Sequence, residues 1–250
     1  MMRLLVSDFD RTLYVNHTIS EENLRALKQW QKDGNLFAIA TGRNQHSIIE
    51  RMDEFSLAPD YLICNNGGII LNENYELLFQ KFIELNAAVD IIKYLYENYE
   101  NSLTIIGVDC TTKILCDKGI DNQKSADRIL AIEELRKINS VIQISKKFAT
   151  EEKTRALTDH LNEKYQSSIS AYCNVINADI VAKNVNKAEG VQFILDLHKN
   201  ITDVIVIGDS YNDIEMIKRF HGYTLCHANE DVKKIASHVC MNVASAVHFA

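Results

Sequence analysis

Two acidic residues, Asp8 and Asp10, follow directly on a largely apolar run at residues 3–7. If that run forms a strand, side-chain alternation places both carboxylates on the same side of the extended chain. Carboxylates that close repel one another unless they share a proton or a cation. Mg²⁺ is the cation that prefers such a cluster of hard oxygen ligands. The spacing therefore predicts a magnesium site at the end of this strand.

A second set of residues is suited to binding an anion. Thr41 and Gly42 follow the apolar run 36–40, where a turn into a helix offers a hydroxyl group and backbone amides. Lys187 begins a later predicted helix and would add a positive charge at the same edge of the sheet. In open parallel sheets ligands bind beyond the carboxyl ends of the strands, so these residues belong with Asp8 and Asp10.

Two further aspartates, Asp209 and Asp213, follow the apolar run 204–207 at a predicted helix start. Aspartate is a common helix cap, so neither residue would be informative alone. An anion held beside a metal ion and several carboxylates is most simply a phosphoryl group, and a carboxylate is the available nucleophile. Together these residues predict phosphoryl-transfer chemistry.

The elements that must position these residues alternate between strand and helix. Short apolar runs without polar alternation are typical of strands buried on both faces of a parallel sheet. We expect such strands at 3–7, 36–40, 61–64, 204–207 and 223–226. Helical spacing of apolar residues, with Ser20 as a cap and Gly34 as a stop, predicts helices at 21–33, 44–55, 187–197 and 213–220. The expected fold class is α/β, a doubly wound parallel sheet.

The pattern changes between residues 82 and 182. Here we expect helices at 87–99 and 150–165, and strands at 103–108, 113–116, 141–145, 168–172 and 175–182. Strands in adjacent pairs indicate an antiparallel sheet, so this segment reads as α+β. We predict a core domain formed by 1–81 and 183–250, interrupted by an inserted domain at 82–182.

Composition excludes several classes of protein. The 250 residues carry 27 Lys and Arg against 34 Asp and Glu, a net charge of −7, which argues against a nucleic-acid partner. No stretch approaches the roughly 18 apolar residues that span a bilayer, and Asp8 comes too early for a signal peptide. Six cysteines include no C-x-x-C pair. We expect a cytoplasmic protein with reduced thiols, no membrane partner and an oligomeric state that the sequence leaves open.

The order and spacing of the chemical residues resemble those of the haloacid dehalogenase-like hydrolases. Four motifs carry the resemblance: D-x-D-x-T at 8–12, T-G-R at 41–43, K-x-x-G-V at 187–191 and G-D-x-x-N-D at 208–213. The N-N-G-G turn at 65–68 and the H-A-N-E segment at 227–230 look like the Cof-type branch, in which an α+β cap lies between the second and third motifs. The resemblance covers nearly the whole chain.

The resemblance implies a role for each matching residue. Asp8 would attack phosphorus and form an aspartyl-phosphate, and Asp10 would act first as general acid and then as general base. Mg²⁺ would be held by the Asp8 carboxylate, the Asp10 backbone carbonyl and Asp209, with Asp213 supporting this shell. The residues expected to contact the phosphoryl group are Thr41, Gly42, Lys187 and Asn212.

The implied function is a Mg²⁺-dependent phosphatase for a small phosphorylated metabolite, such as a sugar phosphate, a nucleotide or a cofactor phosphate, which the cap would select. A phosphomutase of the same superfamily and a non-catalytic phospho-receiver are the alternatives, although a receiver is a single domain of about 100 residues. Lys183 could replace Lys187, but A-E-G-V after Lys187 better fits a helix start. Arg43 fits a substrate contact, a cap or an ion pair.

Other residues of the inserted segment are less informative. Tyr94, Tyr96 and Tyr99 fit the amphipathic cover of a core better than a pocket. Asp109, Lys113 and Asn174 are polar and could face substrate, without a spacing rule to choose among them. Because the sequence ends soon after residues 243–247, we expect the last helix of the family to be nearly absent.

Overall fold

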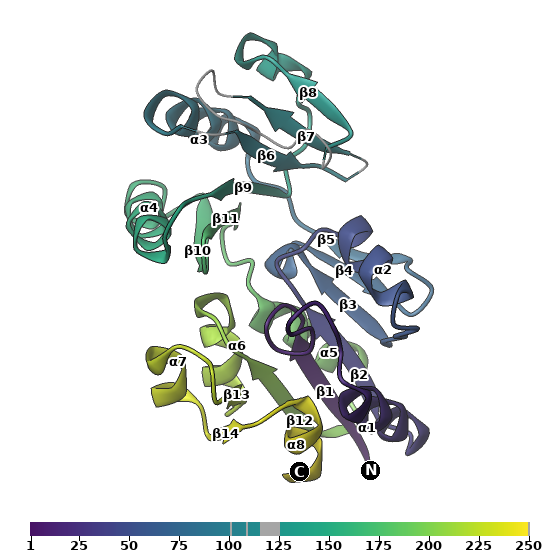
Figure 1. Cartoon of the computed structure of the whole chain (residues 1–250). Coiled ribbons are helices and arrows are strands. Elements are labelled where there is room, and N and C mark those ends of the chain that lie inside the picture. The colour runs from purple at the N-terminus through teal and green to yellow at the C-terminus, as the bar shows by residue number, and fades with distance from the viewer. Residues whose placement is uncertain (101, 109, 116–125, 250) are drawn as a thin grey trace. The chain divides into compact units, whose positions relative to one another are not determined.

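The computed structural model of the protein describes residues 1–100, 102–108, 110–115 and 126–249, so Asp109 and the end of the expected strand 113–116 lie outside it. The chain divides into two compact units. The first comprises Met1–Phe79 and Asn186–Ala250, and the second comprises Gln80–Val185. Figure 1 shows the elements of each unit along the chain. No helix among the described residues is both long and apolar enough to span a membrane.

The first unit is built on an eight-stranded sheet with the order β14-β13-β12-β1-β2-β3-β4-β5. Its strands are β1 (Met2–Asp8), β2 (Leu36–Ala40), β3 (Tyr61–Cys64), β4 (Ile69–Asn72), β5 (Leu77–Gln80), β12 (Ile201–Gly208), β13 (Tyr223–Leu225) and β14 (His238–Cys240). Neighbours from β14 to β3 pair in parallel, whereas β4 is antiparallel to β3. The α/β class and the central strands are thus confirmed.

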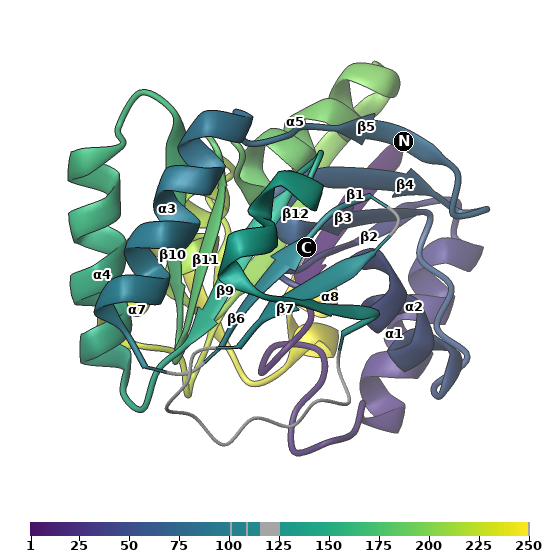
Figure 2. The same ribbon diagram turned by 90° about the horizontal axis from the view of Figure 1, so that it is seen from above.

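Helices cover both faces of this sheet. They are α1 (Glu21–Lys32), α2 (Gln45–Asp53), α5 (Lys187–Leu197), α6 (Ile214–Arg219), α7 (Glu230–Ile235) and α8 (Val243–Phe249). Figure 2 shows α5 on one side of the sheet, with α1 and α2 on the other. Ser20 caps α1 by accepting a hydrogen bond from the Asn23 amide at 3.2 Å, as predicted.

Packing between α5 and the sheet explains why the K-x-x-G-V motif contains a glycine. Val191 and Ile194 of α5 pack against Leu4, Val6 and other buried residues of the central strands. Gly190 lies so close to β3 that a Cβ atom there would come within 2.4 Å of Ile63 Cγ2. The glycine of K-x-x-G-V therefore lets α5 approach the sheet, which fixes the position of Lys187 at the start of the helix.

The last helix departs from expectation. Residues Val243–Phe249 form α8, so the helix that we expected to be nearly absent is present, although it is short. It is anchored where the Ala244 amide donates to Asn23 Oδ1 at 2.9 Å, across 221 residues of sequence. This bond satisfies one backbone amide in the first turn of α8. A local sequence pattern does not reveal it, because the two residues are far apart in the sequence.

The second unit is α+β. Its sheet has the order β10-β11-β9-β6-β7-β8, and all pairs are antiparallel except β7 with β8. The elements are α3 (Leu85–Asn98), β6 (Leu103–Ile106), β7 (Thr111–Ile114), β8 (Arg128–Leu130), β9 (Gln143–Lys147), α4 (Glu151–Lys164), β10 (Ile169–Asn174) and β11 (Asn177–Ala182). Tyr94, Tyr96 and Tyr99 pack against its apolar core, as their spacing indicated.

Candidate functional site

The sheet register brings the predicted residues to one edge of the first unit. β1 lies between β12 and β2, with Ser7 opposite Ile207 and Asp8 opposite Ala40. Asp8 ends β1, Thr41 follows β2 and Asp209 follows β12, so all three lie at the carboxyl ends of adjacent parallel strands. The residues that precede them in each strand are mostly apolar and buried in the sheet. The polar groups therefore lie at its edge, where ligands bind in parallel sheets.

Three buried aspartates form the centre of the site. One carboxylate oxygen from each of Asp8, Asp209 and Asp213 lies within 4.8 Å of the other two. Asp213 Oδ2 accepts hydrogen bonds from the backbone amides of Asp209 and Ser210, each at 3.0 Å. The short 3₁₀ turn Tyr211–Asp213 therefore directs Asp213 back toward the end of β12.

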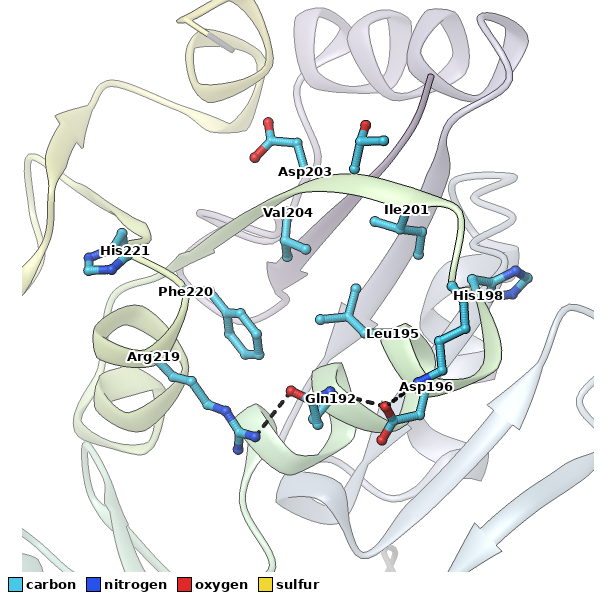
Figure 3. A pocket seen from close by; sticks show the side chains of 12 residues that line it. Gln192, Leu195, Asp196, His198, Ile201, Asp203, Val204, Arg219, Phe220 and His221 are labelled. Carbon is cyan, nitrogen blue, oxygen red and sulfur yellow. Dashed lines mark hydrogen bonds and ion pairs between the residues drawn. The ribbon is translucent and has the colours of Figure 1, made fainter.

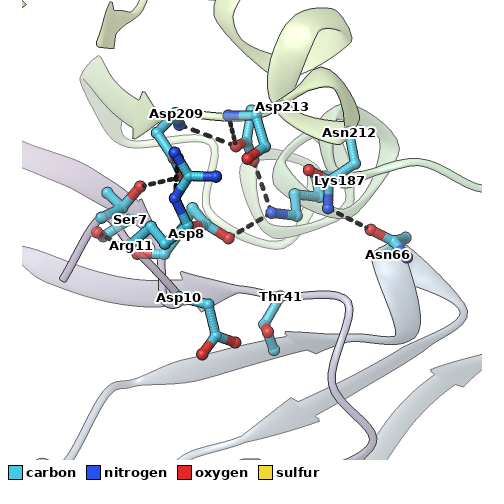
Figure 4. Close-up of polar contacts among 12 residues, drawn as sticks. Ser7, Asp8, Asp10, Arg11, Thr41, Asn66, Lys187, Asp209, Asn212 and Asp213 are labelled. Atoms are coloured by element: carbon cyan, nitrogen blue, oxygen red, sulfur yellow. Dashed lines mark hydrogen bonds and ion pairs between the residues drawn. The ribbon is translucent and has the colours of Figure 1, made fainter. Parts of the chain in front are cut away.

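Lys187 joins two of these aspartates. Its Nζ atom is 2.6 Å from Asp8 Oδ1 and 2.6 Å from Asp213 Oδ1, and its side chain is 0% exposed (Figure 4). Burial lowers the pKa of Lys187, but the charges of Asp213 and Asp8 outweigh it and raise the pKa above 10.5. Lys183 belongs to the second unit, where its backbone carbonyl accepts a hydrogen bond from Lys81 Nζ at 2.8 Å. The lysine beside the carboxylates is thus Lys187.

Burial and mutual repulsion disfavour the charged forms of Asp8 and Asp209. Burial raises the pKa of Asp8 well above 3.8; Lys187 opposes this, whereas Asp213 and Asp209 add to it. Burial and Asp213 likewise raise the pKa of Asp209. Asp209 Oδ1 accepts a hydrogen bond from Thr12 Oγ1 at 3.1 Å, but buried Oδ2 accepts none from the described residues. Convergent hard oxygens with an unsatisfied lone pair fit a divalent cation such as Mg²⁺.

Asp10 lies apart from this cluster. Its Oδ2 and Oδ1 atoms accept hydrogen bonds from Arg43 Nε and Nη2, each at 2.6 Å. The side chain of Asp10 is 37% exposed, whereas that of Asp209 is 0% exposed. Of the four residues assigned to the metal, the structure therefore groups the side chains of three, and it pairs Asp10 with Arg43. Arg43 therefore makes an ion pair with Asp10, which is one of the roles that the sequence left open for it.

The turn after β2 presents Thr41 and Gly42. Thr41 is buried, and its amide donates to the Ile63 carbonyl at 2.8 Å. Its Oγ1 atom accepts a hydrogen bond from the Arg43 amide at 3.1 Å, which uses an oxygen lone pair and keeps the hydroxyl hydrogen as a donor. Gly42 follows in the turn that leads to Asn44, the cap of α2.

Asn212 has a partner that we did not predict. Its Nδ2 atom donates to Asn66 Oδ1 at 2.9 Å, and its buried Oδ1 accepts no hydrogen bond from the described residues. Asn66 lies in the turn after β3, where Gly67 has φ +104° and a Cβ atom would come within 2.4 Å of the Asn186 carbonyl oxygen. The N-N-G-G sequence marked this turn, but only the fold shows that it supports Asn212.

Arg11 is the other residue that sequence reasoning missed. Its Nε atom lies 3.3 Å from Asp209 Oδ2. The sequence signal that could have identified Arg11 is its position between Asp10 and Thr12, inside the D-x-D-x-T motif. Figure 4 shows Arg11 beside Asp209, while Lys187 reaches Asp8 and Asp213.

A separate pocket of about 460 Å³ lies at the opposite edge of the first unit's sheet. Leu195, Val204 and Phe220 line its apolar part (Figure 3). Its wall includes Ile201, where β12 begins, whereas Asp209 follows the end of the same strand. This pocket is thus distinct from the acidic site.

Comparisons with known proteins bear on the family and the fold. A family model described as haloacid dehalogenase-like hydrolase matches residues 5–247. The phosphatase YwpJ of Bacillus subtilis is 24% identical, covering 96% of this chain and 95% of that protein. The 5-amino-6-(5-phospho-D-ribitylamino)uracil phosphatase YcsE of the same organism is also 24% identical, over 95% and 89% of the two chains. The solved structure of a haloacid dehalogenase-like hydrolase from B. subtilis superimposes with a TM-score of 0.84 at 20% identity, covering 98% of this chain and 99% of that one, which supports the fold.

Proposed function

Because the chain belongs to the haloacid dehalogenase-like hydrolases, we propose that it is a Mg²⁺-dependent phosphatase that hydrolyses a small organic phosphate through an aspartyl-phosphate on Asp8. One observation carries the proposal: Asp8, Asp209 and Asp213 converge at the carboxyl edge of the sheet with fully buried Lys187 between two of them. Phosphoryl transfer depends mainly on positioning and on neutralising charge, and this arrangement supplies both.

Asp8 acts as the nucleophile in the first step. Lys187 donates to Asp8 Oδ1, which leaves Oδ2 as the oxygen that attacks phosphorus. A bond forms between Oδ2 and phosphorus as the bond from phosphorus to the ester oxygen breaks. The product of this step is a phosphoryl group on Asp8 and a leaving alkoxide that needs a proton.

Asp10 supplies that proton and later accepts one. Its carboxylate is separate from the three clustered aspartates and is oriented by Arg43. In the second step Asp10 deprotonates a water molecule, which attacks phosphorus and breaks the bond to Asp8. Free phosphate leaves, and the Asp8 carboxylate is restored.

Asp8, Asp209 and Asp213 would hold Mg²⁺, together with the backbone carbonyl of Asp10. The cation would neutralise phosphoryl and carboxylate charge. Thr41 donates its hydroxyl hydrogen to a phosphoryl oxygen, and the Gly42 amide lies in the adjacent turn. Asn212, fixed by Asn66, contacts the phosphate region.

The segment 82–182 is proposed as an inserted cap domain that selects the substrate. It lies entirely within the second compact unit, Gln80–Val185, which extends two residues further at one end and three at the other. Closure of such a domain would exclude bulk water during transfer. One relative is named for a substrate with a phosphorylated ribityl chain, which supports testing polyol and sugar phosphates before nucleotides and cofactor phosphates.

A phosphate-release screen tests this function. The protein is incubated with sugar phosphates, polyol phosphates, nucleotides and cofactor phosphates, with Mg²⁺ or with chelator. We expect Mg²⁺-dependent release from at least one class. Isomerised phosphosugar without free phosphate would instead show a phosphomutase, and phosphorylated protein that keeps its phosphate for long periods would show a receiver.

A further inference from the structure

Arg11 has a backbone conformation that favours glycine. Its φ is +66°, in the left-handed region. Two contacts maintain this conformation: the Arg11 amide donates to the Tyr14 carbonyl at 2.8 Å, and His227 Nε2 donates to the Arg11 carbonyl at 2.7 Å. Arg11 thus lies inside the D-x-D-x-T motif with its left-handed backbone conformation held at both the amide and the carbonyl.

The side chain of Arg11 reaches an oxygen of the acidic cluster. Arg11 Nε lies 3.3 Å from Asp209 Oδ2, which is buried and accepts no hydrogen bond from the described residues. The exposed fractions of the two side chains are 46% and 0%. The guanidinium therefore extends from solvent to a buried carboxylate oxygen, and it can turn outward without unfolding its surroundings.

A divalent cation among the three aspartates would use the same oxygen. The cation and the guanidinium are both attracted to Asp209 Oδ2, and they repel one another. Lys187 is different, because it is bound to Asp8 Oδ1 and Asp213 Oδ1 and is fully buried. Of these two cations, Arg11 alone has an exposed route away from the cluster.

We propose that Arg11 is a built-in counter-ion that competes with the divalent cation for Asp209 Oδ2 and thereby sets the metal affinity of the site. This inference rests on the metal-binding part of the proposed function. In the metal-free protein Arg11 balances charge at Asp209. Binding of the cation displaces the guanidinium toward solvent, so the intrinsic affinity of the carboxylates is reduced by the cost of breaking the Arg11–Asp209 pair.

Calorimetric titration of the full-length, metal-free protein with Mg²⁺ tests the inference directly. Arg11→Gln keeps the side chain as far as the Nε position and keeps the backbone strain, but removes the charge. Arg11→Asn removes the charge with a residue that tolerates the left-handed region, so it provides a second variant if Gln folds poorly. We expect both to bind Mg²⁺ about fivefold more tightly than the wild type, equivalent to about 1 kcal/mol.

Two control variants separate competition from a general effect of charge. Arg11→Lys keeps a cation within reach and should bind Mg²⁺ within about twofold of the wild type. Arg25→Gln removes the same charge from an exposed pair with Glu21, at 3.1 Å, and should leave the affinity unchanged. Unchanged affinity in the folded Arg11→Gln and Arg11→Asn proteins, an equal gain in Arg25→Gln, or absence of Mg²⁺ binding to the wild type would each overturn the inference.

The titration does not depend on turnover. If the Arg11 variants bind Mg²⁺ more tightly but no ester releases phosphate, the inference stands and the proposed phosphatase function fails. If phosphate is released in the presence of Mg²⁺ but the Arg11 variants bind the ion like the wild type, the inference fails alone.

Discussion

Arg43 holds Asp10 through both carboxylate oxygens, with Nε to Oδ2 and Nη2 to Oδ1 distances of 2.6 Å. This fork-to-fork geometry fixes the orientation of a carboxylate more strictly than a single bond would. A further hydrogen bond from Arg43 Nη1 to Ser47 Oγ, at 3.1 Å, anchors the guanidinium to α2. The two aspartates of D-x-D are therefore in different environments: Asp8 is buried beside Lys187, and Asp10 is oriented by Arg43.

The separate environment of Asp10 predicts a leaving-group effect. Asp10→Asn removes the proposed general acid, so turnover of an alkyl phosphate should fall by roughly a hundredfold or more. An aryl phosphate with an acidic phenol needs little protonation as it leaves, so its transfer to Asp8 should slow much less. The test measures single-turnover phenol release and alkyl phosphate turnover, each in the wild type and in Asp10→Asn. Equal loss for both substrates would remove Asp10 from the acid role.

Orientation by Arg43 predicts that Arg43→Lys damages the same step. Lysine keeps the charge but cannot bind both oxygens in a fork, so kcat for an alkyl phosphate should fall by about tenfold with little change in KM. The same kinetic assay on Arg51→Lys provides a control, because Arg51 makes a comparable pair with Glu54, with Nη1 to Oε2 at 2.6 Å. A KM increase at constant kcat would instead indicate that Arg43 binds substrate.

The buried position of Lys187 predicts a cost in stability as well as activity. Lys187→Met leaves Asp8 and Asp213 buried without their shared cation, so the metal-free protein should lose about 3 kcal/mol of unfolding free energy. Urea denaturation in chelator measures this loss. Lys183→Met is the matched control and should unfold like the wild type. Equal losses of unfolding free energy in the two variants would contradict the stabilising role of Lys187 between Asp8 and Asp213.

The raised pKa of Asp8 predicts a pH-dependent gain in stability on its replacement. Burial favours the protonated form of Asp8 in the folded protein, whereas the unfolded chain releases the proton near its ordinary pKa of 3.8. The contribution of Asp8 to the free energy of unfolding therefore falls as pH rises above about 4. Asp8→Asn should be more stable than the wild type in chelator, by a margin that grows toward neutral pH.

Denaturation of both proteins across this pH range, with and without Mg²⁺, checks the sign. Mg²⁺ should stabilise the wild type, because it binds the folded state, and it should stabilise Asp8→Asn less. A difference that shrinks as pH rises in chelator would contradict the assigned cause.

The sequence predicted the strand ends well because an apolar run followed by a polar residue is a local pattern. β2 and β3 have the bounds that were expected, and β1 and β12 extend the expected runs. The pattern missed β14, because His238 and Val239 are exposed and lack a buried run. The antiparallel strand β4 was also missed, since its direction depends on the turn at Asn66 and Gly67.

The sequence could not predict how side chains pair across the site. Arg43 and Asp10 are separated by 33 residues, and Asn212 and Asn66 by 146. Alternation placed Asp8 and Asp10 on the same side of an extended chain, but β1 ends at Asp8 and only an isolated bridge involves Asp10. Once the chain leaves the strand, the period of two no longer applies, so the two carboxylates take different partners.

Phosphate release by Asp8→Asn tests the central claim most directly. The amide keeps the shape of the side chain but is a poor nucleophile, so with Mg²⁺ and the preferred ester the rate should fall below detection. The control Asp53→Asn, at an exposed position of α2, should keep the wild-type rate. Phosphate release by folded Asp8→Asn at more than about one hundredth of the wild-type rate would show that Asp8 is not the nucleophile.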